Sequence, residues 1–174
     1  FLLIGLLLFC FLGGGAAYLS NLLGNSREVI EYNNKLVDHR NKIVVESEKL
    51  QTSYRSALEL SEISSALDSY KDSVDEVSTS INNEAVSAKG QPLKELNQKY
   101  IEKAKEIADV VEESMKDAKT VYDISDEDIN NFNNKIKELD QINVDIAKKL
   151  NELAGFEAIS KKDIDDLEKS LREE

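Results

Sequence analysis

The chain has 174 residues, of which 32% are charged, and its formal net charge is −12. An acidic chain repels phosphate backbones, so the composition argues against nucleic-acid binding. A single cysteine excludes an internal disulfide, and the length suffices for an anchor and one domain of ordinary size.

Residues 1–23 form an apolar segment without a charged side chain. The first charged residue is Arg27, and a run of about 20 apolar residues is long enough to cross the hydrocarbon core of a bilayer. We therefore predict a membrane anchor over residues 1–24, either a transmembrane helix or an uncleaved signal anchor. The alternative is a cleaved signal peptide, for which Gly15 and Ala17 would be the small residues near the cleavage site.

The start of the apolar segment resembles that of processed type IV pilins, which begin with Phe and an apolar helix, as at Phe1. The resemblance implies a subunit whose first helix packs in a filament core, but Gly5 stands where that family has an acidic residue. A lipoprotein signal would centre on Cys10, the only cysteine. Phe9 is larger than the residue that such signals need there, so Cys10 is interpreted as a small apolar residue within the helix.

Residues 25–59 are predicted to form a membrane-proximal helical stalk. Apolar residues recur every seven positions from Val29 to Ala57, whereas the intervening positions hold polar residues such as His39 and Glu46. A stripe this narrow favours an exposed stalk. The alternative is that the segment folds back as a fourth helix of a bundle.

The next apolar residues, from Leu60 to Ile81, follow strict three-four spacing and predict a helix over residues 60–88. Gly90 and Pro92 mark a break, because Gly ends helices and Pro suits the first turn of the following one.

A second long helix is predicted over residues 93–122, with an eleven-residue apolar period that is close to that of a straight helix. The tyrosines at or beside the apolar stripes are predicted to pack in the core: Tyr54, Tyr70, Tyr100 and Tyr122.

A third long helix is predicted over residues 126–154. Ser125 suits the N-cap and Asp128 the third helical position, which together form a capping box. In its heptad stripe, Asn143 occupies a position that is expected to be apolar. A buried Asn at such a position fixes the register of packing at a cost in stability.

The predicted fold is all-α: an N-terminal transmembrane helix followed by an elongated antiparallel helical bundle. Three long helices of similar length form the bundle over residues 60–155. Gly155 ends the last of them, and residues 156–174 hold a short helix that packs near the lower part of the first helix.

No catalytic, cofactor-binding or metal-binding residue is predicted. His39 is the only histidine, so the sequence offers neither a zinc site nor a catalytic triad. The acidic run from Asp123 to Asp128 lacks the glycine and the final glutamate of an EF-hand, and its carboxylates suit a helix N-terminus. We expect that the protein is not an enzyme and binds no cofactor.

These patterns predict a membrane-anchored, extracytoplasmic, acidic helical-bundle protein of a bacterial cell envelope. It would contact the membrane through residues 1–23, and protein partners or other copies of itself through its helix faces. Neither nucleic acid nor a small-molecule ligand is expected. The alternatives are the sensory input domain of a truncated receptor, a pilin-like filament subunit and a tethered adaptor that faces the cytoplasm.

Overall fold

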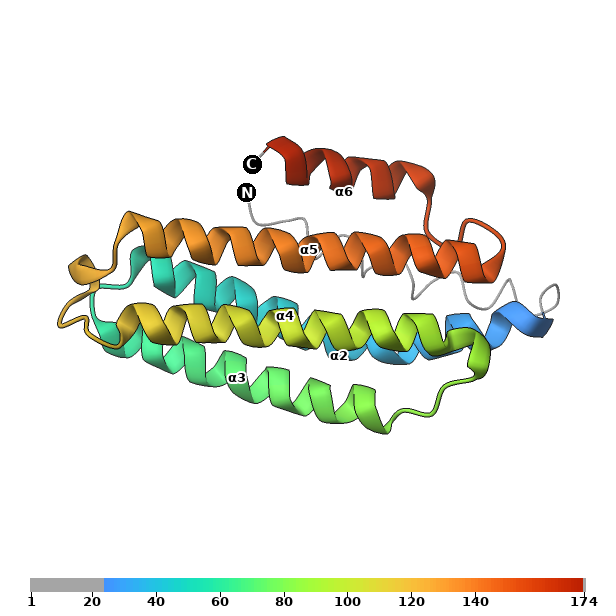
Figure 1. Ribbon diagram of the computed structural model, residues 1–174, viewed down its shortest axis with the longest axis horizontal. Helices are drawn as coiled ribbons and strands as arrows, with labels where there is room; N and C mark the ends of the chain where they lie inside the picture. The colour runs from blue at the N-terminus through green and yellow to red at the C-terminus, as the bar shows by residue number, and fades with distance from the viewer. Residues whose placement is uncertain (1–23, 174) are drawn as a thin grey trace.

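The computed structural model describes residues 24–173, and this part of the chain is helical throughout apart from its connections (Figure 1). The long helices are α2 (Gly24–Ser56), α3 (Leu60–Asn83), α4 (Gln91–Met115) and α5 (Asp126–Ala154), and they are followed by α6 (Lys161–Glu173). Two 3-10 turns lie in the connections, η1 (Ala88–Gly90) and η2 (Val121–Asp123). The prediction of an all-α helical bundle is confirmed.

Helices α2 to α5 run alternately in opposite directions along the long axis of the molecule (Figure 1). Each packs against the next helix in the chain, and α5 closes the bundle by packing against α2. Helices α2 and α4 therefore face each other across the core diagonal, as do α3 and α5.

The segment predicted as a stalk, residues 25–59, is instead the first helix of the bundle. Its apolar stripe is buried, and so is a second column of polar residues spaced seven apart: Ser26, Asn33, Arg40, Ser47 and Tyr54. We call these residues the polar column of α2. Because the buried face of α2 includes polar side chains, its apolar pattern alone underestimates the width of that face. The bundle consequently has four long helices rather than three.

Helix α3 carries the predicted core stripe but ends at Asn83, before residue 88. All of its predicted stripe residues beyond Leu60 are buried: Ile63, Leu67, Tyr70, Val74, Val77 and Ile81. The break that follows is also as predicted, with Pro92 in the first turn of α4. A Cβ atom at Gly90 would lie 2.7 Å from Val86 Cγ2, so close packing in this connection requires glycine.

Helix α4 differs from the prediction in period and in length. Its buried seam follows a heptad that includes Asn97, and the helix ends at Met115 instead of near residue 122. The Asp123 carboxylate accepts hydrogen bonds from two backbone N–H groups, of Lys119 (2.9 Å) and Thr120 (2.8 Å), and this local turn replaces the helical continuation. Tyr122 follows at 88% exposure, so its predicted place in the core is wrong.

Helix α5 begins and ends as predicted. The Asp128 N–H donates to Ser125 Oγ at 3.1 Å, and the Ser125 N–H donates to Asp128 Oδ2 at 3.1 Å, which completes the capping box. Gly155 ends the helix in the left-handed region, with φ of 79°. Within the helix, Asn143 is buried in the seam.

Helix α6 packs across the seam between α2 and α5 and forms a second, smaller core there. This core consists of Val37 and Val44 of α2, Val144 and Ala147 of α5, and Ile164 and Leu167 of α6. The Asn151 amide fixes the connection by donating to Ile159 O at 2.7 Å and accepting from Ile159 N at 2.8 Å.

The predicted membrane anchor, including Cys10, lies outside the described residues except for Gly24. Among the helices of residues 24–173, none is both long and apolar enough to cross a membrane.

Candidate functional site

The polar column of α2 reaches across the core and contacts the helices opposite. At one end of the bundle, Ser26 Oγ donates to Ala154 O of α5 at 2.6 Å. Near the other end, Tyr54 OH donates to Ser114 Oγ of α4 at 2.7 Å. The column thus links α2 to its neighbour and to its diagonal partner by hydrogen bonds rather than by apolar contact alone.

Arg40 lies at the middle of the column and is the largest fully buried side chain among the described residues, at 2% exposure. Its Nη1 donates to Asn97 Oδ1 on the diagonal helix α4, and its Nη2 donates to Asn33 Oδ1 at 3.2 Å. Asn97 in turn donates through Nδ2 to Leu93 O at 2.6 Å, which fixes the amide with its oxygen toward the guanidinium. The result is an ordered polar layer in the centre of an apolar core.

Burial dominates the electrostatics of this layer. It lowers the pKa of Arg40 to about 10, so the guanidinium still carries its charge at neutral pH. Burial also raises the pKa of Tyr32 to about 12 and raises the pKa of Tyr100, which lies beside Asn143 of α5. The layer therefore holds the Arg40 guanidinium beside hydroxyl and amide groups from α2, α4 and α5, and the Asp140 carboxylate of α5 lies close enough to help raise the pKa of Tyr100.

This polar layer is suited to specifying structure rather than to chemistry. A charged guanidinium is a poor base, and neither of the hydrogen-bonded amides contacting it is a nucleophile. Directional bonds across the diagonal hold only when Arg40 and Asn97 lie at the same height, so they fix how α2 and α4 are aligned.

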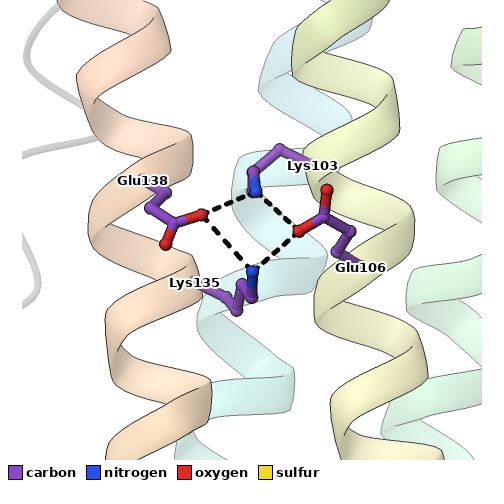
Figure 2. Close-up of polar contacts among 4 residues, drawn as sticks. All are labelled: Lys103, Glu106, Lys135 and Glu138. Atoms are coloured by element: carbon purple, nitrogen blue, oxygen red, sulfur yellow. Dashed lines mark hydrogen bonds and ion pairs between the residues drawn. The ribbon is translucent and has the colours of Figure 1, made fainter.

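A second polar cluster lies at the surface between α4 and α5, where two lysines and two glutamates form a closed ring (Figure 2). Lys103 Nζ lies 2.6 Å from Glu106 and 2.6 Å from Glu138. Lys135 Nζ lies 2.8 Å from Glu106 and 3.5 Å from Glu138. Opposite charges alternate around the ring, and two of its four ion pairs, Lys103–Glu138 and Lys135–Glu106, join the two helices.

Contacts within the ring favour the charged forms of Lys103, Glu106 and Glu138. Hydrogen bonds to Glu106 and then to Glu138 raise the pKa of Lys103. Hydrogen bonds from Lys103 lower the pKa of both glutamates, with Lys135 contributing. Lys103 is therefore not primed as a base, and neighbouring cations oppose metal binding by the carboxylates. We interpret the ring as a structural clamp.

Sequence reasoning missed both clusters, although each has a signal. The polar column repeats every seven residues beside the apolar stripe, and the ring arises from the same Lys-x-x-Glu spacing at residues 103–106 and 135–138. Of the residues considered for chemistry, His39 is half-buried on α2, and the Asp123 and Asp128 carboxylates bond to the backbone at turn and helix starts. Within the described residues, no group of three or more His, Cys, Asp or Glu side chains could hold a metal ion.

The described chain is thus an all-α protein: an antiparallel bundle of four long helices with a fifth helix packed along one seam. Scans of protein-family models, of curated proteins and of solved structures each found no match to this chain.

Asn143→Leu is expected to raise the thermal melting temperature. Asn143 is 4% exposed, and an apolar side chain of similar size removes the cost of burying its amide, about 1–2 kcal/mol. Because a buried Asn also specifies register, the variant is expected to broaden the distribution of oligomeric states in sedimentation velocity. A large fall in the melting temperature would show instead that the amide makes an essential hydrogen bond.

The buried tyrosines predict that the bundle loses stability at alkaline pH. Burial raises the pKa values of Tyr32, Tyr54, Tyr70 and Tyr100 above the ordinary tyrosine value of about 10. Above pH 10 the unfolded chain loses these protons while the folded chain keeps them, so each group lowers the free energy of unfolding as pH rises toward its folded pKa. Arg40 acts in the opposite sense, because burial lowers its pKa to about 10 on folding, but it is one group against four.

Urea unfolding at about pH 9, 10 and 11 measures this dependence, with a limiting slope of about 1.4 kcal/mol per pH unit for each tyrosine. Stability that is constant or rising across this range would contradict the prediction.

Proposed function

We propose that this protein is an interaction or structural module of a bacterial cell envelope, in which an N-terminal apolar segment anchors an extracytoplasmic helical bundle to the membrane. The observation that carries the proposal is the joining of the uncharged residues 1–23 directly to α2, which begins at Gly24. An uncharged run of about 20 residues has the composition and length of a membrane span.

The character of the bundle supports an interaction role over catalysis. The polar clusters at Arg40 and at Lys103 use their side chains for internal hydrogen bonds and ion pairs. The charge of −12 falls entirely after residue 26 and favours solubility beside a surface that carries negative headgroups.

Protease accessibility of a C-terminal tag tests the location of the bundle. We expect the tag on the full chain to be digested in cells that have lost their wall but keep a sealed membrane, without lysis. Protection of the tag until lysis would place the bundle in the cytoplasm and overturn the proposal.

A second candidate function is the sensory input domain of a receptor. It is favoured by one contact: Ser26 Oγ of α2 lies 2.6 Å from Ala154 O of α5, so the first and fourth bundle helices meet at one end. Because α6 runs back along the bundle from this end, the chain beyond it would have to return before a second membrane segment could leave beside the first (Figure 1). The gene sequence beyond the codon for Glu174 tests this candidate, which requires a second apolar segment of about 20 residues.

A further inference from the structure

Exposed hydrophobic side chains gather at one end of the bundle. Three large hydrophobic residues are exposed within residues 24–173: Val45 at 41%, Leu58 at 80% and Tyr122 at 88%. Val45 lies on the side of α2, whereas Leu58 lies in the α2–α3 connection and Tyr122 in the α4–α5 connection. Both connections lie at the end opposite Gly24, which we call the distal tip and define as residues 57–60 and 116–127 (Figure 1).

Contacts between the helices hold the two connections at the same end of the bundle. Where α2 ends, the Tyr54 ring lies 4.9 Å from the ring of Phe132 near the start of α5. The neighbouring Arg55 Nη2 donates to Asn133 Oδ1 at 2.7 Å. These contacts are across the same end of the bundle, so Leu58 and Tyr122 both lie at that end of the molecule.

Carboxylates hold both connections in fixed conformations. Glu62 Oε1 accepts from the N–H groups of Leu58 (3.2 Å) and Glu59 (3.3 Å). In the other connection, Asp123 Oδ2 accepts hydrogen bonds from the N–H groups of Lys119 and Thr120. Because the backbone is fixed, the outward direction of Leu58 and Tyr122 is part of the fold.

The residues beside them confirm that this exposure is selective. Val121 and Ile124, on either side of Tyr122, pack against the main core, as do Ala57 and Leu60 around Leu58. Each connection thus turns its other apolar residues inward and leaves one large hydrophobic side chain outside. Tyrosines held rigidly at a surface are among the residues that contribute most to protein–protein binding.

The distal tip is also acidic. Its exposed carboxylates are those of Glu59, Asp117, Asp123, Asp126 and Glu127. Two lysines oppose them, and one of these, Lys116, already pairs with Glu113 of α4 at 3.3 Å. Hydrogen bonds from the backbone lower the pKa of Asp123, so its charge persists at mildly acidic pH.

We propose that the distal tip binds a positively charged polypeptide segment of another protein, with Tyr122 and Leu58 as apolar anchors and the surrounding carboxylates as charge partners. The proposal rests on the interaction function proposed above and specifies its surface. Charge complementarity selects this occupant, because the same carboxylates would face one another between two copies of the tip. They would also repel anionic lipid headgroups.

Site-specific photo-crosslinking of the full chain in intact cells tests the proposal. The probe is p-benzoylphenylalanine, placed at position 58 or 122, with position 45 as the matched control on the side of α2. We expect crosslinks at 58 and 122 to one protein, through a segment that mass spectrometry shows to be rich in Lys and Arg, and none to that protein at 45.

The crosslinked segment, made as a synthetic peptide, then provides an affinity measurement. Tyr122→Ser is expected to weaken its binding about tenfold, because truncating an aromatic anchor costs more than about 1 kcal/mol. Val45→Ser is expected to leave the affinity unchanged, and added salt is expected to reduce it.

Three results would overturn the proposal: crosslinks at 58 and 122 to lipid or to a second copy, crosslinks to a neutral or acidic segment, or an affinity insensitive to Tyr122→Ser. A protein crosslink at 45 alone would reject the distal tip as the binding surface while leaving the interaction function standing. The absence of protein crosslinks at all three positions, together with a protected C-terminal tag, would reject both.

Discussion

Ile107→Asp is expected to prevent the bundle from folding. Ile107 is fully buried on α4, within the main core that all four long helices share. A carboxylate there has no place in the apolar seam, and burying it ionised and without a partner costs more than about 5 kcal/mol, comparable with the whole stability of a domain of this size. Far-ultraviolet circular dichroism and thermal melting of the full chain measure the result.

Val45→Asp is the matched control for this substitution. It introduces the same carboxylate in place of Val45, a β-branched residue of α2 that is 41% exposed. A surface substitution of this kind changes stability by about 0.5 kcal/mol or less. Cooperative melting of the Ile107→Asp variant at the temperature of the unmodified chain would show that the assigned core face of α4 is wrong.

Arg40→Ala is expected to give the second-largest effect, a loss of about 3 kcal/mol or more in the free energy of unfolding. The variant leaves the oxygens of Asn97 and Asn33 without their donor and opens a cavity in the centre of the bundle. Chemical denaturation at neutral pH measures the change.

Arg40→Met separates the two causes, because methionine fills much of the volume but restores no hydrogen bond. We expect it to recover only part of the loss, since the methionine side chain refills much of the cavity but leaves the two amide oxygens without their donor. Equal stability of the Arg40→Ala variant and the unmodified chain would show that the polar layer contributes nothing to folding.

The polar column explains how far the sequence predicts this fold. Where a buried seam is apolar, as from Ile63 to Ile81 in α3, spacing alone identifies the core residues correctly. Where capping chemistry is local, as at Ser125 and Asp128, the start of the helix is also predictable. Both signals are contained in a few neighbouring residues.

The predictions from the sequence are wrong where the interaction that determines the structure joins residues far apart in the chain. In the sequence, Arg40 resembles a solvated charged residue. In the structure it is buried and donates a hydrogen bond to Asn97, which lies 57 positions away in the chain. For the same reason α2 was predicted as a stalk, since its second column becomes a packing face only through contacts with α4 and α5. The prediction for Tyr122 is wrong for the opposite reason. Its spacing in the sequence continues the apolar stripe of α4, although the helix has already ended at Met115.

The antiparallel arrangement determines how the molecule responds to tension. Gly24 and the distal tip lie at opposite ends of α2, about 50 Å apart at 1.5 Å per residue (Figure 1). A pull between them runs along the helix axes, so α2 yields only by sliding past α3 and α5 over its whole length. Sliding breaks the Arg40 layer and the end contacts of Ser26 and Tyr54 together, whereas peeling would break them in succession. The bundle therefore resists tension most strongly along the direction from Gly24 to the distal tip.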